Sequence, residues 1–340
     1  MASITQVAKL AGVSTATASR VVGEADYPVS LATRERVLAA ARELDYVPNA
    51  LARGLLKSTV PIVGVIVHDI TDPYFNEVVR GVEDAANAAG YLVITCSSDR
   101  DPARQNSYAR LLRSLRAAAV IFAGSGIADG EANLELERHV AGMRENGSAV
   151  VHLSPHAGGP PDVGVDNVAG IAAMVAALVE LGHERIAFLA GPSALLVARE
   201  RLTGYRRGMA DARLTVDERL IVSTDFDRAG GAVGVDELLA RGVEFSAICC
   251  ANDLLALGAL TRLAELGRAV PDDVSVAGFD DISIAALSAP HLSTVRLPLR
   301  EMGRRGFENA MRKLNGEDGA PQTLPTQVVL RDSTARRNGQ

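Results

Sequence analysis

The 340-residue sequence predicts an α/β fold: a two-lobed body built on parallel sheets, preceded by a small all-α N-terminal domain. From Ile62 onward, continuous apolar runs such as IVGVIV (62–67) alternate with segments of helix length, as expected for strands covered on both faces. The alternation starts again after VGVD (163–166), so two series and hence two lobes are expected. Before Ile62 the apolar spacing is helical only.

The N-terminal segment TQVAKLAGVSTATASRVV (5–22) predicts two short helices joined by a tight turn. Gly12 can adopt the positive φ that such a corner needs, and Ser14 is a good N-cap for the second helix. A third helix is expected to start at Ser30 and to close a small core through Val37, Ala41 and Leu44. This is the helix-turn-helix arrangement, whose second helix lies in the major groove of DNA.

Further elements follow from the same alternation of apolar strands and helical segments. In the first lobe we expect strands at 62–67, 91–96, 118–124 and 148–154, with helices at 73–89, 102–115 and 128–145. In the second we expect helices at 167–181, 198–212, 228–241 and 253–266, with strands at 185–191, 220–223, 246–251 and 273–279. Two late strands are predicted at 293–298 and 323–333.

Composition excludes a membrane-spanning protein, because no apolar run reaches the necessary length. The N-terminus has no signal-peptide pattern, so we expect a cytoplasmic protein without a membrane partner. The net charge of −6 is unevenly spread: residues 1–61 hold seven Lys and Arg against five Asp and Glu, which leaves −8 for the remainder. A basic head on an acidic body is the asymmetry that favours nucleic-acid binding by the head.

The sequence offers little for catalysis or metal binding. Cys96, Cys249 and Cys250 have neither metal-ligand spacing nor a disulfide pattern, so buried thiols are expected. Ser125 in GSG (124–126) lacks the glycine of a nucleophile elbow, and the dinucleotide fingerprint is incomplete there. His152 and His156 form a close pair without a further ligand at metal spacing. We therefore expect a protein that is not an enzyme, without metal or cofactor.

The sequence resembles the lactose-repressor (LacI/GalR) family of bacterial transcription regulators. The resemblance rests on motifs that occur in the family's order along nearly the whole chain: VAKLAGVS, SRVV, YVPNALAR (46–53), DITDPYF (69–75), VGVDN (163–167), RLTGY (201–205), ANDLLALGAL (251–260) and DDVSVAGFDD (272–281). It implies a periplasmic-binding-protein-like body. It also implies a helix-turn-helix domain at 1–47, a hinge and linker at 48–61, a first lobe at 62–162 with 293–332, and a second lobe at 163–292.

The second helix of the head is expected to face a DNA major groove. Arg20 can donate two hydrogen bonds to guanine, Ala16 can touch a thymine methyl, and Thr15 can do either weakly. The resemblance assigns base discrimination to Thr15 and Ala16. Phosphate anchoring suits Ser14, Thr17, Ser19 and Tyr46.

Residues 49–55 resemble the family's hinge helix. This segment is too short to be helical alone and contains Gly54, so it needs something to order it. The resemblance implies paired binding in the minor groove, with Leu55 as an apolar wedge between base steps. The alternative is a flexible linker with an ordinary leucine. The residues implied in DNA contact are Asn49, Ala52, Arg53 and Leu55.

Several polar and aromatic residues follow predicted strands, where ligands of open α/β sheets bind. Each alone could be a helix cap or a surface residue, but together they predict an effector pocket between the lobes. They are Asp69, Tyr74, Phe75, Arg201, Phe226, Asn252 and Asp280. Leu195, Leu196 and Val197 replace polar residues of some family members, which argues against a purine effector; a sugar or related metabolite is the working expectation.

The sequence thus predicts a transcriptional regulator that acts as a repressor, with pseudo-palindromic double-stranded operator DNA and a small-molecule effector as partners. The polar tail RDSTARRNGQ (331–340) lacks the leucine heptad of tetrameric family members, so a homodimer is expected. The alternative is a solute-binding or sugar-processing protein on the same two-lobed fold, against which residues 1–55 argue. Whether the effector releases DNA or promotes its binding stays open.

Overall fold

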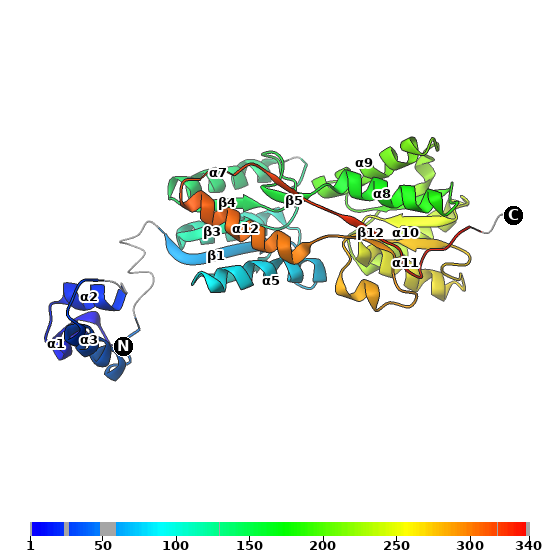
Figure 1. The fold of residues 1–340 in the computed structure, drawn as a ribbon. Coiled ribbons are helices and arrows are strands. Elements are labelled where there is room, and N and C mark those ends of the chain that lie inside the picture. Colours follow the sequence, from blue (N-terminus) through cyan, green and yellow to red (C-terminus); the bar gives the residue numbers. More distant parts are fainter. Residues whose placement is uncertain (1, 24–26, 48–58, 129, 318, 338–340) are drawn as a thin grey trace. The chain divides into compact units, whose positions relative to one another are not determined.

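The computed structural model describes residues 2–23, 27–47, 59–128, 130–317 and 319–337 (Figure 1). The chain forms two compact units, Met1–Pro61 and Ile62–Gln340. The hinge residues predicted at 48–58 lie outside the described residues.

The described part of the N-terminal unit contains the predicted helices α1 (Ile4–Ala11), α2 (Thr15–Gly23) and α3 (Leu31–Glu43). Gly12 has a φ of 66°, the left-handed conformation that the turn requires. The side chain of Ser14 accepts a hydrogen bond from the amide of Thr17 at 3.0 Å, which confirms it as a cap. The three helices enclose one core, made of Val7, Ala8, Ala11, Ala18, Val21, Val37, Ala40 and Ala41.

The first lobe of the second unit is a four-stranded sheet in the order β2-β1-β3-β4. Its strands are β1 (Val60–Val67), β2 (Leu92–Ser97), β3 (Ala117–Phe122) and β4 (Ala149–His152). Apolar residues of α5 (Pro73–Ala88) and α12 (Leu299–Leu314) pack together on one side of the sheet. On the other side, α6 (Pro102–Ser114) and α7 (Glu131–Glu145) form a separate cluster with residues of β1, β3 and β4. The result is the three-layer arrangement expected for parallel strands.

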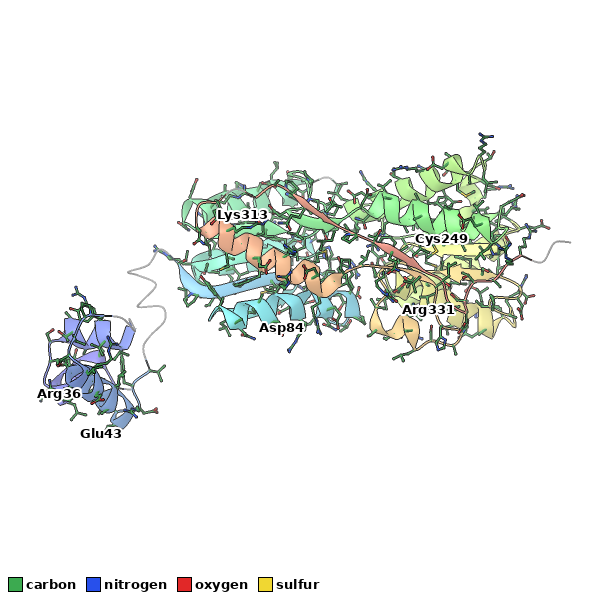
Figure 2. All side chains as sticks on the ribbon, in the orientation of Figure 1. Arg36, Glu43, Asp84, Cys249, Lys313 and Arg331 are labelled. Atoms are coloured by element: carbon green, nitrogen blue, oxygen red, sulfur yellow. The ribbon has the colours of Figure 1, made fainter. Side chains whose placement is uncertain are left out.

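The second lobe repeats this plan with the sheet order β7-β6-β8-β9, all parallel. Its strands are β6 (Ile186–Ala190), β7 (Ile221–Ser223), β8 (Ala247–Cys250) and β9 (Ser275–Ala277). Its helices are α8 (Asn167–Glu180), α9 (Leu196–Asp211), α10 (Arg228–Ala240) and α11 (Asp253–Glu265), with short 3-10 turns η1 (Glu218–Leu220) and η2 (Ser283–Ala286). The α8–α9 and α10–α11 pairs pack closely (Figure 1). Cys249 and Cys250 are buried in β8 as free thiols, as predicted (Cys249 is marked in Figure 2).

Short strands run along the connections between the lobes. β5 (Val163–Val165) pairs in parallel with β11 (Gln322–Leu324), and β10 (Thr294–Arg296) pairs antiparallel with β12 (Gln327–Val329). The single late strand predicted at 323–333 is thus two strands. Pro325 lies between them, and a proline cannot donate a ladder hydrogen bond.

The predicted return of the whole segment 293–332 to the first lobe is wrong at both ends. Val295 accepts a hydrogen bond from the amide of Asp280, and Ser333 accepts one from the amide of Val276, so both ends belong to the second lobe. The part that does return includes α12, a helix that the sequence analysis did not predict. Glycines allow its close contact with α5: a side chain on Gly303 would lie 2.0 Å from the backbone oxygen of Val78. Near the end of α12, Lys313 (labelled in Figure 2) forms an ion pair with Asp162 at 2.6 Å.

No helix in the described parts of the chain is long and apolar enough to span a membrane.

Candidate ligand pocket and nucleic-acid interface

The helix α2 presents an exposed polar face. Ser14, Thr15 and Ala16 at its start and Ser19 and Arg20 further along are exposed, while Thr17 is partly buried. The opposite face is apolar and buried against the core of the head, through Ala18 and Val21. The face of α2 that carries these exposed residues therefore points away from the core of the head.

Arg20 is positioned by a residue that the sequence analysis missed. Its Nη1 donates to the hydroxyl of Tyr27 at 3.0 Å, and its guanidinium lies over the Tyr27 ring at 5.3 Å. Arg34 in turn donates to the backbone oxygen of Tyr27 at 2.6 Å. Tyr46, which is also predicted to anchor a phosphate, follows α3 and is partly buried. Asn49, Ala52, Arg53 and Leu55 lie outside the described residues.

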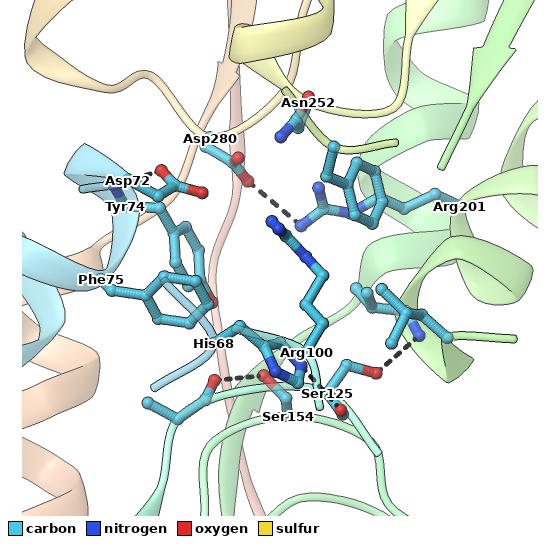
Figure 3. A pocket seen from close by; sticks show the side chains of 14 residues that line it. His68, Asp72, Tyr74, Phe75, Arg100, Ser125, Ser154, Arg201, Asn252 and Asp280 are labelled. Carbon is cyan, nitrogen blue, oxygen red and sulfur yellow. Dashed lines mark hydrogen bonds and ion pairs between the residues drawn. The ribbon is translucent and has the colours of Figure 1, made fainter. Parts of the chain in front are cut away.

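In the second unit, a pocket lies between the two lobes at the carboxyl ends of their strands (Figure 3). It brings together six of the seven predicted effector residues. The lining comprises His68, Asp72, Tyr74, Phe75, Arg100, Ala123, Ser125 and Ser154 from the first lobe and Leu195, Val197, Arg201, Phe226, Asn252 and Asp280 from the second.

The seventh predicted residue, Asp69, does not line the pocket. Its carboxylate accepts hydrogen bonds from the amide and hydroxyl of Thr71, at 2.8 and 2.7 Å, and so closes a local turn. Asp72 lies in the pocket instead, where it also caps α5 by accepting from the amide of Tyr74 at 2.9 Å. Sequence spacing did not distinguish these two aspartates, because either can cap a turn or a helix.

Arg201 is held by the protein at every nitrogen of its guanidinium. It donates to Oδ1 of Asn167 at 3.1 Å, to the backbone oxygen of Ala251 at 2.6 Å and to Oδ1 of Asp280 at 3.1 Å. It also stacks on the ring of Phe279 at 4.2 Å. Both side chains of the Arg201–Asp280 pair are only 6% exposed. Arg201 therefore fixes the Asp280 carboxyl at the pocket wall and joins the ends of three chain segments.

Burial raises the pKa of the two carboxyl groups that line the pocket. Burial raises the pKa of Asp280 to about 7, against the opposing effect of the Arg201 guanidinium. Burial also raises the pKa of Asp72, and the neighbouring Arg100 counteracts this increase. These two carboxyl groups come from different lobes, so a ligand that contacts both would bridge the cleft.

His68 and Arg100 are further pocket residues that the sequence analysis missed. Nε2 of His68 lies 2.9 Å from the backbone oxygen of Ser125, so Nε2 must carry the proton and Nδ1 is left as an acceptor. Burial, with a smaller effect of Arg100, lowers the pKa of His68 to about 4 and keeps it neutral. Among the described residues neither Nδ1 of His68 nor Nε of Arg100 has a hydrogen-bond partner, although both atoms are buried.

Arg100 reaches the pocket through an unusual backbone. Asp99 and Arg100 have φ values of 51° and 59°, in the left-handed region that non-glycine residues rarely adopt. Such conformations concentrate at functional sites. Figure 3 shows the Arg100 side chain extending between the lobes toward Asp280 and Arg201. The signal that could have found it is its position just after the strand predicted at 91–96, the same rule that located the other residues.

The two lobes also contact each other directly beside the pocket. The amide of Leu196 donates to the oxygen of Gly126 at 3.0 Å, and that of Ala128 donates to the oxygen of Ala194 at 2.8 Å. The hydroxyl of Ser125 accepts from the amide of Val197 at 3.0 Å. The lobes are therefore closed on each other. The space left in the pocket is about 50 Å³, and roughly 10–15 Å³ of such space holds one water molecule, so a larger ligand requires the lobes or Arg100 to move.

Comparison with known proteins identifies the family. Residues 3–49 match the family described as bacterial regulatory proteins, lacI family, and residues 175–334 match the periplasmic binding protein-like domain. The chain is 32% identical over 340 residues to the HTH-type transcriptional repressor PurR of Vibrio parahaemolyticus. The alignment covers 99% of this chain and 100% of that repressor. The chain belongs to the lacI family.

Solved structures of similar proteins agree with this assignment. The lac repressor dimer bound to operator and the anti-inducer ONPF has a TM-score of 0.85 at 26% identity, over 98% of this chain and 99% of that one. A complex of the transcriptional regulator CelR with cellobiose has a TM-score of 0.71 at 31% identity, over 98% and 100%. As a LacI-family protein, the chain is a DNA-binding transcriptional repressor.

Proposed function

We propose that this LacI-family chain binds a pseudo-palindromic operator as a homodimer, and that an effector between the lobes of its body controls operator affinity. The carrying observation is that carboxyl groups and rings from both lobes converge on one pocket, in a chain that also bears a helix-turn-helix head. A solute-binding protein would not need the head. We assign the chain no catalytic role and place it in the cytoplasm, where operator DNA is found.

We propose the DNA-contact roles expected from the sequence: Thr15, Ala16 and Arg20 at base edges, and Ser14, Thr17, Ser19 and Tyr46 at phosphates. Their support is the exposed face of α2 and the support of Arg20 by Tyr27. The hinge at 48–61, with Asn49, Ala52, Arg53 and Leu55 in the minor groove, completes the proposed interface.

Arg20→Ala tests the role of the head. Removing a guanidinium that reads a base should weaken operator binding by about 1–3 kcal/mol. The measurement is a fluorescence-anisotropy titration of a duplex that the wild-type chain has enriched from a random library. Arg36→Ala, an exposed arginine on α3, is the matched control. Equal affinities for Arg20→Ala and wild type would remove Arg20 from the interface.

We propose that the effector is a sugar or a related polyhydroxylated metabolite. Asp72, Asp280 and Nδ1 of His68 can accept hydrogen bonds from hydroxyl groups, and Arg100 can donate to their oxygens. The apolar faces of Phe75 and Phe226 suit the face of a sugar ring. CelR, a relative of similar structure, is solved with cellobiose. A thermal-shift screen with sugars, nucleosides and small acids tests the class, because a ligand at 100 times its Kd adds about 2.7 kcal/mol of stability.

We propose that the effector acts through the connections between the lobes. The amide of Leu297 donates to the backbone oxygen of Asp280 at 3.3 Å, and Leu297 directly precedes the turn into α12 of the first lobe. A ligand that favours one arrangement of the lobes therefore shifts the whole first lobe relative to the second. In a dimer this changes the spacing of the two hinge segments, which decides whether both can bind one operator.

The pKa of Asp280 predicts a pH dependence of stability. Between its ordinary pKa of 3.8 and about 7, the folded chain keeps a proton that the unfolded chain has released. Stability therefore falls as pH rises through this window and does not change further above it. Asp280→Asn removes this contribution, so the unfolding free energy of wild type minus that of the variant should decrease from pH 5 to pH 8. Urea denaturation at both pH values measures it, and a difference independent of pH would contradict the assignment.

A further inference from the structure

We infer that the first lobe carries a second DNA-contact site, a basic pocket that binds backbone phosphates beside the operator. It lies away from the ligand pocket, between the C-terminal halves of α6 and α7. Its lining residues are Arg110, Arg113, Ser114, Arg116, His139 and Asn146. The inference rests on the proposed operator binding by the head.

The three arginines of this basic pocket have no carboxylate partner among the described residues. None of them forms a side-chain hydrogen bond or ion pair within that part of the chain, and no lining residue is acidic. Glu135 faces His139 at 3.6 Å, so the carboxylate next to the site meets the imidazole and not the guanidiniums. Three uncompensated cations in one open hollow are an attractive site for phosphate oxygens.

One of these arginines is seated by a glycine. A side chain on Gly142 of α7 would lie 2.1 Å from Cζ of Arg113, so the guanidinium packs against the α7 backbone at this glycine and a larger residue would displace it. Arg113 is accordingly half-buried, whereas Arg110 and Arg116 are exposed. The site is therefore partly preorganised, which reduces the entropy lost on binding.

Helix ends give an ordinary reason for part of this charge. An arginine in the last turn of a helix complements the partial negative charge of its C-terminus, which accounts for Arg113 on α6. It does not account for Arg116, which follows α6 with a φ of 52°, nor for the meeting of all three on one hollow beside α7. Clustering of like charge costs free energy, so a phosphate partner is the simpler explanation.

The position of the basic pocket indicates DNA as the source of phosphate. Arg116 immediately precedes β3, and Asn146 shortly precedes β4, so the pocket lies at the edge where strands begin. β1 begins at this edge too, because its far end meets the far end of β3 through the Ala123 amide and the Ile66 oxygen. The chain from the DNA-binding head enters β1 there. This edge of the first lobe is therefore the one to which the head is covalently connected.

The test compares salt dependence on two duplexes that share an operator enriched by the wild-type chain from a random library. One covers only the two half-sites, about 20 base pairs, and the other extends two helical turns of about 10 base pairs on each side. The logarithm of affinity falls with the logarithm of salt concentration by about 0.9 per phosphate contacted. Replacing Arg110, Arg113 and Arg116 by Gln should therefore make the slope less steep by about 2.7 per bound chain on the long duplex only.

Two control variants test whether the effect depends on charge and on its position. Replacing the same three arginines by Lys keeps the charges and should keep the slope, while replacing Arg199, Arg206 and Arg207 of α9 by Gln removes equal charge elsewhere and should leave it unchanged. An unchanged slope for the Gln variant on the long duplex overturns the proposal. The proposal is also overturned if pyrophosphate raises the melting temperature of wild type but not of the Gln variant, while the salt dependence of DNA binding is the same for both. The site would then bind a free anion and not DNA. If wild type fails to bind even the short duplex, the operator-binding proposal itself fails.

Discussion

Arg201→Ala is expected to destabilise the body by about 3–5 kcal/mol, the cost of breaking a buried ion pair. The substitution leaves the buried carboxyl of Asp280 without its cation and the backbone oxygen of Ala251 without its donor. It also removes the cation that stacks on Phe279. Urea unfolding of the full chain at pH 8, above the pKa of about 7 of Asp280, measures the loss. The effector response should disappear with the pocket wall.

The double variant Arg201→Ala/Asp280→Asn separates ion pairing from packing. If an unpaired carboxyl causes most of the loss, the amide in its place should restore part of the stability. The control is Arg207→Ala on the same helix, whose exposed pair with Asp211 at 3.6 Å should contribute less than about 1 kcal/mol. A loss for Arg201→Ala no larger than that of the control would show that the Arg201 network does not hold the lobe together.

Leu287→Asp is expected to separate the proposed dimer and to lower operator affinity by about 10²–10⁴-fold, the gain that linking two binding modules provides. Leu287 follows η2 and is 79% exposed, and Ile284 beside it is 43% exposed, while the adjacent Ala285 is buried. We infer that the partner chain covers these two neighbouring apolar side chains in the proposed dimer. The similar lac repressor structure is a dimer on its operator.

Sedimentation equilibrium of the full chain, followed by titration of the selected operator, measures both effects. Leu134→Asp is the control, because Leu134 on α7 is also highly exposed, at 67%, and the charge change is identical. A Leu287→Asp variant that remains a dimer would place the interface elsewhere. A monomeric variant with wild-type operator affinity would contradict the need for paired heads.

The sequence located most of the ligand pocket because one local rule applies to parallel sheets. Residues that follow strands in the sequence meet at one edge in space, and this rule found Tyr74, Phe75, Arg201, Asn252 and Asp280. The same rule also covered Arg100, which was overlooked. It did not separate Asp69 from Asp72, because the choice depends on which one the turn with Thr71 uses.

By itself the sequence determined the helical head, the two lobes and the family, since apolar periodicity, caps and glycine turns are properties of neighbouring residues. Only the tertiary structure decided the partners of Arg201, which lie 34, 50 and 79 residues away along the chain. It also decided that α12 packs on α5, whereas the strands on either side stay with the second lobe or its connection. The physical reason is that these hydrogen bonds and close contacts join residues distant in sequence. Apolar periodicity identifies which face of an element is buried but not which other element it packs against.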